Sequence, residues 1–302
     1  MHSGWETHAH HHTRIEVDMI RERMDFIKGL ALEAGRLTLE GYGKSAPMPK
    51  DLQDGYDIAT EYDLRTEELV KKRIQDEFGE PVLGEEDGLL GDLEAARGRL
   101  WIVDPIDGTF NYQRGLPHYG VSIAYCANGV PVCGAVYLPA LGQFYHAAQG
   151  EGAFLAEGDA AQAVPIRVSP ERELVRLIIG FAGRDVYRLL AACADEGIPR
   201  RSLRFSMCAV QDLTYIAAGR MDAYLHTSLN LWDCAATDII LREAGGPPAF
   251  DYEGIPIFPT YVTRRLEQKK PYTFTFVAAS SLDLFAEPLE RIILSAGLQS
   301  GG

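Results

Sequence analysis

The sequence predicts a mixed α/β protein in which an α+β half, residues 15–149, precedes an α/β half, residues 150–302. Three patterns favour this fold class. Apolar residues recur at helical spacing near the N-terminus, β-rich segments follow one another from about residue 100, and short strands then alternate with helices. The histidine-rich residues 1–14 are predicted to form a disordered tail, because terminal segments of this composition are usually not tied down.

In the N-terminal half, apolar positions at helical spacing predict helices over residues 15–43 and 64–78. The segment PVLGEEDG, residues 81–88, predicts a short strand that runs into a turn. The continuous apolar run at residues 100–103 predicts a buried strand. We expect that strand to end at Asp104, because the proline after it has no N–H for the ladder.

The segments after this strand predict an antiparallel meander, with Asn128 and Gly129 as a hairpin turn. In the C-terminal half, strands are predicted for LVRLIIGF, RSLRFS, DAYLHT and TFTFVAAS. Helices are predicted over residues 184–196, 209–218, 233–244 and 281–295. Strands and helices that alternate in this way are typical of an α/β arrangement.

Composition and charge exclude several classes of protein. The chain has 302 residues, of which 46% are apolar, enough for a large buried core. A formal net charge of −14 argues against sequence-independent binding to nucleic acid, which depends on Lys and Arg contacts. We expect no membrane span and find no signal-peptide pattern. Five scattered cysteines without a CxxC pair argue against disulfides and structural zinc, so we expect a cytoplasmic protein.

The most informative segment is WIVDPIDGTFN, residues 101–111. Asp104 and Asp107 lie across a turn, close enough to face the same cations. Gly108 lets the backbone approach a ligand closely, and Thr109 can open a helical turn whose free N–H groups face an anion. Neighbouring carboxylates repel each other, and oxygen ligands favour Mg²⁺ or Mn²⁺ over zinc. The segment therefore indicates a divalent-cation site, with simple capping of a turn as the alternative.

Other acidic residues have both a functional and a purely structural interpretation. Glu85 and Glu86 follow the strand-like PVLG and could form a solvated acidic turn. Asp57 and Asp63 bracket a short strand and could be an N-cap and a surface charge. Asp233 precedes the helical CAATDIILREAGG and could be its N-cap. Taken one by one, these residues leave both interpretations open.

Taken together, these segments resemble the inositol-monophosphatase superfamily of metal-dependent, lithium-sensitive phosphatases. GEE at 84–86, WIVDPIDGTFNY and, far downstream, WDCAATDIILREAGG occur in the family's order and approximate spacing within residues 15–295. The resemblance implies a layered αβαβα sandwich of the inositol-monophosphatase and fructose-1,6-bisphosphatase type, usually assembled as a homodimer. Lys50 is similar in position to a mobile-loop lysine of the family, with a two-residue insertion after it.

The resemblance also implies a role for each matched residue. It implies two or three bound Mg²⁺ ions, with Mn²⁺ as an alternative, held by Glu85, Asp104, the carbonyl of Ile106, Asp107 and Asp233. Thr109 and Asp63 would orient and deprotonate the attacking water, and Glu86 would assist from beside the cluster. The substrate phosphate would be contacted by Gly108, Thr109 and Asp107.

Substrate recognition is where the sequence departs from the family. In inositol-specific members a glutamate precedes the WD aspartate by seven residues, and His226 stands there in this chain. A histidine lacks the two acceptor oxygens that a carboxylate gives to a diol, and it could instead be satisfied by backbone groups. The segment RFSMCAV, 204–210, brings the bulkier Met207 and Cys208. We expect His226 and Ala209, from these two regions, to contact the substrate.

We therefore expect a Mg²⁺-dependent phosphomonoesterase for a small phosphorylated metabolite, such as inositol monophosphate or a related sugar or polyol phosphate. Fructose 1,6-bisphosphate, histidinol phosphate and 3′-phosphoadenosine 5′-phosphate are alternative substrates, because members of the family hydrolyse each. A regulatory protein that keeps the fold without turnover is a further alternative. Retention of Asp104, Asp107 and Asp233 argues against it.

Overall fold

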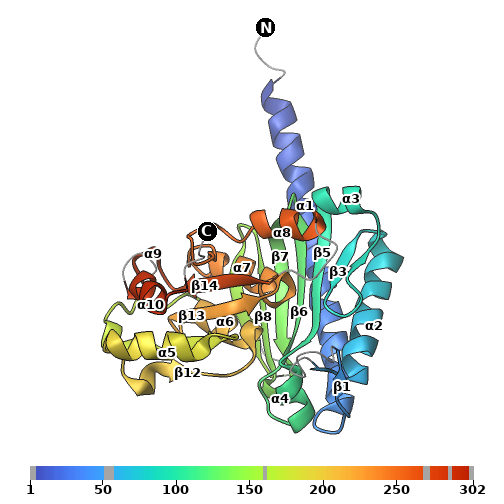
Figure 1. Cartoon of the computed structure of the whole chain (residues 1–302). Coiled ribbons are helices and arrows are strands. Elements are labelled where there is room, and N and C mark those ends of the chain that lie inside the picture. Colours follow the sequence, from blue (N-terminus) through green and yellow to red (C-terminus); the bar gives the residue numbers. More distant parts are fainter. Residues whose placement is uncertain (1–4, 51–57, 159–161, 268–272, 285–287, 299–302) are drawn as a thin grey trace.

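A computed structural model describes residues 5–50, 58–158, 162–267, 273–284 and 288–298 of the chain (Figure 1). Its helices are α1 (Trp5–Gly41), α2 (Glu61–Phe78), α3 (Leu93–Gly98), α4 (Thr109–Arg114), α5 (Val186–Asp195), α6 (Ala209–Ala217), α7 (Leu231–Glu243), α8 (Thr260–Glu267), α9 (Leu282–Leu284) and α10 (Glu290–Ser295). Its strands are β1 (Met48–Pro49), β2 (Ile58–Ala59), β3 (Val82–Gly84), β4 (Leu89–Leu90), β5 (Arg99–Asp107), β6 (Gly120–Ala127), β7 (Val130–Leu138), β8 (Gln143–Ala148), β9 (Gly152–Glu157), β10 (Val164–Pro165), β11 (Ile179–Ala182), β12 (Leu203–Arg204), β13 (Ala223–Leu229) and β14 (Phe274–Ala279). Within these ranges, none of the helices combines the length and the hydropathy that a membrane span requires.

Two sheets form the framework. The larger has eight strands in the order β10-β9-β8-β7-β6-β5-β3-β4, and only β3 and β5 pair in parallel among its described strands. The smaller has the order β12-β11-β13-β14, in which β11 pairs in parallel with both neighbours and β13 pairs with β14 antiparallel. The predicted meander is the run from β6 to β9. Asn128 and Gly129 have φ of 51° and 76° at its first turn, as a type I′ hairpin requires.

Helices cover both sheets, in three layers (Figure 1). α1 and α2 pack on one face of the eight-stranded sheet, where Ile74 of α2 joins the same apolar cluster as Trp101 of β5. α6 and α7 fill the space between the two sheets, and α5 and α10 cover the outer face of the smaller sheet. The next residue of β5, Ile102, faces α7, so this strand is apolar on both sides because both sides are covered. The αβαβα sandwich confirms the predicted fold class.

The first two helices begin earlier than predicted. α1 starts at Trp5, ten residues before the expected start, so the segment predicted to be a disordered tail is helical from Trp5 on. Residues 5–28 contain neither glycine nor proline, so no helix-breaking residue separates Trp5 from the apolar residues at helical spacing. The prediction used only the apolar residues at helical spacing from residue 15 on, and the predicted helix was therefore too short at its N-terminal end. α2 starts at Glu61, with Thr60 as its N-cap.

The strand β5 runs to Asp107 and does not end at Asp104 as predicted. Its pairing with β6 shifts register between these two residues, so Pro105 falls where the ladder is interrupted. The missing N–H of the proline therefore costs little there. Of the helix predicted over 281–295, the structure describes α9 and α10, and residues 285–287 lie outside the described ranges, as does Asp57.

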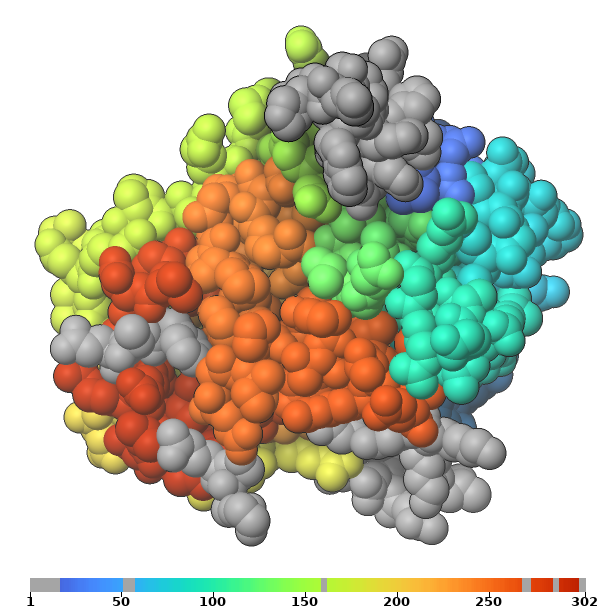
Figure 2. Space-filling model, turned by 90° about the horizontal axis from the view of Figure 1, so that it is seen from above, coloured from blue at the N-terminus to red at the C-terminus, as the bar shows by residue number. Residues whose placement is uncertain are grey.

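Two short helices that the sequence did not predict, α3 and α8, lie side by side (Figures 1 and 2). In Figure 2 the orange α8 borders the teal α3 on the viewed face. Arg97 of α3 lies 4.0 Å from Glu267 of α8 at this contact. α3 is only six residues long, too short for a periodic apolar pattern to reveal it.

Candidate functional site

The predicted metal ligands come from three elements that end or begin at one place. β3 and β5 are parallel neighbours in which Gly84 is paired with Val103. The residues that follow them, Glu85 and Asp104, therefore lie next to each other at the same end of the sheet. Asp107 closes β5, and Asp233 lies in the first turn of α7. One carboxylate oxygen from each of Asp104, Asp107 and Asp233 lies within 4.8 Å of the others.

These carboxylates line a pocket. Its walls are formed by Ile58, Glu85, Asp104, Ile106, Asp107, Gly108, Thr109, Phe110, Met207 and Asp233. All five predicted metal ligands are among them, together with the predicted phosphate contacts Gly108 and Thr109. The lining thus combines an acidic wall, formed by Glu85, Asp104, Asp107 and Asp233, with the apolar side chains of Ile58, Phe110 and Met207.

The acidic wall is electrostatically unfavourable without a cation. Asp104 is fully buried, and among the described residues neither of its carboxylate oxygens has a hydrogen-bond partner. Burial raises the pKa of Asp104 well above its usual range, and the charges of Glu85, Asp107 and Asp233 raise it further. Burial likewise raises the pKa of Asp107 to about 6. Two unsatisfied buried oxygens beside three further carboxylates fit a divalent cation with oxygen ligands.

Backbone donors fix two of the carboxylates. Oδ2 of Asp107 accepts the N–H of Val210, at the start of α6, at 2.7 Å. Oδ2 of Asp233 accepts the N–H of Asn230 at 2.9 Å, in a capping box at the start of α7. Asp233 is thus the third residue of its helix, and Asn230, not Asp233, is the N-cap. Backbone N–H groups at the starts of α6 and α7 thus bind Oδ2 of Asp107 and Oδ2 of Asp233.

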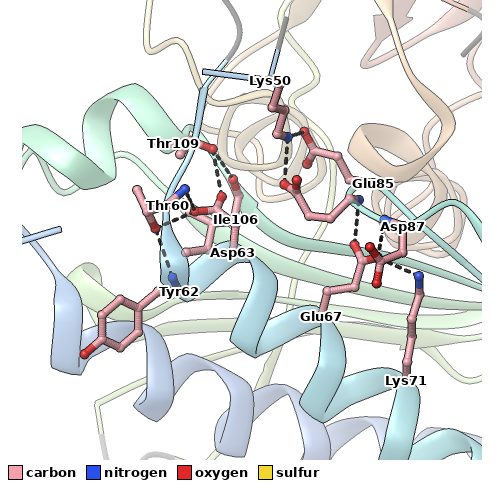
Figure 3. A network of polar contacts seen from close by, with 11 residues as sticks. Lys50, Thr60, Tyr62, Asp63, Glu67, Lys71, Glu85, Asp87, Ile106 and Thr109 are labelled. Atoms are coloured by element: carbon pink, nitrogen blue, oxygen red, sulfur yellow. Dashed lines mark hydrogen bonds and ion pairs between the residues drawn. The ribbon is translucent and has the colours of Figure 1, made fainter. Parts of the chain in front are cut away.

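Lys50 lies beside the acidic wall (Figure 3). Its Nζ is 2.6 Å from Oε1 of Glu85 and 2.7 Å from Oε1 of Glu86. Burial lowers the pKa of Lys50, but the two carboxylates outweigh burial and leave the pKa raised overall. Burial and the neighbouring Glu85 raise the pKa of Glu86 to about 8. Glu86 therefore does not line the pocket and contacts Glu85, a predicted metal ligand, through Lys50.

Asp63 and Thr109 contact each other, and Thr109 also lines the pocket (Figure 3). The Thr109 hydroxyl lies 3.0 Å from Oδ1 of Asp63 and 3.0 Å from the carbonyl oxygen of Ile106. Oδ2 of Asp63 accepts from the N–H and the hydroxyl of Thr60 at 2.7 and 2.6 Å. Burial raises the pKa of Asp63 although these hydrogen bonds lower it. A buried carboxylate with a raised pKa is a better proton acceptor than an exposed one.

The turn after β5 needs the glycine at its centre. Gly108 caps α4 with φ of 87°, and a Cβ there would lie 2.7 Å from the carbonyl oxygen of His118. Asn111 then joins this turn to the segment before α6. Its Nδ2 donates to the carbonyls of His118 at 2.7 Å and Ser206 at 2.8 Å. These contacts hold the segment that carries Met207, one of the residues that line the pocket.

Two predicted substrate contacts do not line the pocket. Nδ1 of His226, on β13, accepts the backbone N–H of Ser228 at 3.0 Å, and burial lowers the His226 pKa to about 4. Ala209 is buried at the start of α6, where its backbone lies next to Asp107. The sequence did not single out Phe110, although it directly follows the DGT of the motif. Its side chain is 48% exposed at the pocket.

Comparisons with known proteins agree with this fold. A model of the inositol monophosphatase family matches residues 19–265. The Nus factor SuhB of Xylella fastidiosa is 32% identical over 273 residues, which cover 88% of this chain and 92% of that protein. The fructose-1,6-bisphosphatase/inositol-1-monophosphatase of Thermotoga maritima is 34% identical over 234 residues, covering 74% and 83%. Among solved structures, an IMPase of Thermotoga maritima superposes with a TM-score of 0.76 at 28% identity, covering 91% of this chain and 98% of that one.

Proposed function

The chain belongs to the inositol monophosphatase family, and we propose that it is a Mg²⁺-dependent phosphomonoesterase that hydrolyses a small phosphorylated metabolite. The observation that carries this proposal is the pair of buried, unpartnered oxygens of Asp104 inside a cluster of carboxylates. Such a cluster is stable when divalent cations balance its charge. The relative from Xylella is named a Nus factor, but a purely regulatory protein would have no need of this complete carboxylate set.

The residues divide into binding and proton-transfer groups. Glu85, Asp104, Asp107 and Asp233, with the carbonyl of Ile106, would hold two or three Mg²⁺ ions, and Mn²⁺ is the alternative. When bound, such ions activate a water molecule and neutralise charge on the phosphoryl group. Gly108 and Thr109 would contact the phosphate through the backbone. The halves 15–149 and 150–302 would each contribute, since Asp233 comes from the second.

Asp63 and Thr109 supply a route for the proton of the attacking water. The Thr109 hydroxyl donates to Asp63, which leaves a lone pair on the hydroxyl oxygen to accept from water. Asp63 then receives the proton through Thr109. Its two hydrogen bonds from Thr60 keep its carboxylate in one orientation during this transfer.

The substrate of this proposal is inositol monophosphate or a related sugar or polyol phosphate. A second class of substrate is favoured by two apolar residues that line the pocket, Phe110 and Met207, which are 48% and 59% exposed. Met207 also has φ of 57°, a backbone conformation that costs a residue with a side chain roughly 1 kcal/mol. These two side chains suit a phosphate ester whose alcohol has an apolar face.

The test measures phosphate release from a panel of esters, with Mg²⁺ and with EDTA. The panel contains inositol 1-phosphate, fructose 1,6-bisphosphate, histidinol phosphate and 3′-phosphoadenosine 5′-phosphate. We expect release that requires Mg²⁺, is strongest for one ester and is inhibited by millimolar lithium. Light scattering should show a homodimer. A protein that binds Mg²⁺ and releases phosphate from none of these esters would contradict the proposal.

A further inference from the structure

A second set of buried charges lies against the turn that carries Glu85 (Figure 3). Glu67, in the middle of α2, is only 1% exposed. Its Oε2 accepts the N–H of Glu86 at 2.8 Å, and its Oε1 accepts the N–H of Asp87 at 2.9 Å. Both donors lie beyond the end of β3, outside its ladder. One side chain of α2 thus holds the two residues that follow Glu85.

Lys71 lies four residues after Glu67 on α2 and contacts the other end of the turn that carries Glu85. Its Nζ lies 2.6 Å from Oε1 of Glu67 and donates to the carbonyl oxygen of Gly88 at 3.2 Å. The lysine is itself only 6% exposed. Two charges buried to this extent have lost most of their hydration, so each depends on the other for compensation.

The turn closes tightly over Glu67. Gly84, the last residue of β3, donates its N–H to the carbonyl of Gly88 at 3.0 Å. A Cβ on Gly84 would lie 2.3 Å from Oε1 of Glu67. The residue before Glu85 is therefore fixed by the strand and by this close approach, and the two after it by hydrogen bonds to Glu67.

We propose that Glu67, with its charge balanced by Lys71, is a positioning residue that directs the Glu85 carboxylate toward Asp104 and so sets the strength of cation binding. This inference rests on the proposed function, in which Glu85 is a metal ligand. Glu67 and Lys71 are both absent from the pocket walls, so they act through the backbone of the turn. Partners of this kind typically change metal affinity by about 10- to 100-fold.

The test compares Glu67→Gln with Glu68→Gln. The first variant keeps the size of the side chain but leaves one acceptor oxygen for two N–H donors and removes the anionic partner of Lys71. The second makes the same change at the next residue of α2, whose side chain is exposed. Mg²⁺ binding to each metal-free protein is measured by isothermal titration calorimetry, and phosphate release is measured as a function of Mg²⁺ concentration.

We expect the Mg²⁺ dissociation constant of Glu67→Gln to rise about 10- to 100-fold. The Mg²⁺ concentration for half-maximal activity should rise with it, while kcat recovers at saturating Mg²⁺. Glu68→Gln should match the wild type in both measurements. A residue that only supports the fold would lower the melting temperature without changing the affinity of the folded protein.

A double variant, Glu67→Gln with Lys71→Met, covers the case in which Glu67→Gln does not fold. It leaves no unpaired buried charge, so the melting temperature should recover, but the turn stays loosely held and Mg²⁺ affinity stays low. Wild-type affinity in either folded variant would overturn the inference. Absence of Mg²⁺ binding to the wild-type protein would overturn the proposed function, and the inference with it.

Discussion

The hydroxyl of Thr109 lies 3.0 Å from Oδ1 of Asp63, a residue 46 positions earlier in the chain. Asp63 belongs to the first turn of α2 and Thr109 begins α4, directly after the carboxylates of β5. The contact therefore connects a buried proton acceptor to the edge of the acidic pocket. The same Asp63 also belongs to the capping box of α2, in which Thr60 is the N-cap, so its proposed catalytic role and its structural role have to be separated by experiment.

Replacing Asp63 with Asn should lower kcat by about 10²- to 10⁴-fold, because the amide cannot accept the proton of the attacking water. The fold should survive, since the amide oxygen still accepts the N–H of Thr60. Steady-state kinetics at saturating Mg²⁺ and thermal melting provide the measurements. Asp92→Asn, the same change at the N-cap of α3, serves as the control and should leave kcat unchanged. Equal kcat values in the two variants would remove Asp63 from the proposed mechanism.

Asp104→Asn should abolish detectable turnover, with a loss of at least about a hundredfold, because it removes a proposed metal ligand from the centre of the cluster. Without metal, the Asp104→Asn variant should melt at a higher temperature than the metal-free wild type, since one of the repelling buried carboxylates is gone. Phosphate release and melting in EDTA test these opposite effects. Activity near that of the wild type would refute the assigned role of Asp104.

Metal-free protein should lose stability as the pH rises from about 4 to about 8. The folded protein raises the pKa of Asp107 to about 6 and that of Glu86 to about 8, and it raises those of Asp104 and Asp233 as well. In this window the folded state binds more protons than the unfolded state, so the free energy of unfolding falls with increasing pH.

The loss should be on the order of a few kcal/mol. Urea unfolding at pH 5 and pH 8 measures it, first in EDTA and then with saturating Mg²⁺, which should reduce the difference between the two pH values. A free energy of unfolding that increases with pH in EDTA would show that these carboxylates do not dominate the stability of the metal-free protein.

The sequence predicted the parts of the site that depend on local order along the chain. Asp104, Asp107, Gly108 and Thr109 are neighbours in sequence, and a strand that ends in a turn brings them together whatever surrounds it. Asp233 and Glu85 required the family resemblance, because nothing in their own segments shows that β3, β5 and α7 meet.

The rest depends on packing that periodicity does not reveal. Glu67 and Lys71 have the i, i+4 spacing of an ordinary surface pair, and only the turn lying against α2 shows that they are buried. His226 was expected at the substrate because of its position before the WD motif. Its Nδ1 is instead occupied by the N–H of Ser228, a local contact within β13.

The exposed apolar residues that line the pocket, Phe110 and Met207, lead to a prediction about substrate choice. Phe110→Ser and Met207→Ser should each lower kcat/KM for cyclohexyl phosphate by about tenfold, because each removes apolar contact worth roughly 1–2 kcal/mol. Inositol 1-phosphate has a ring of the same size with hydroxyl groups, and its kcat/KM should change little. Leu116→Ser is the matched control, since Leu116 is 49% exposed but does not line the pocket. Equal losses for both esters would mean that Phe110 and Met207 shape the pocket without selecting the alcohol.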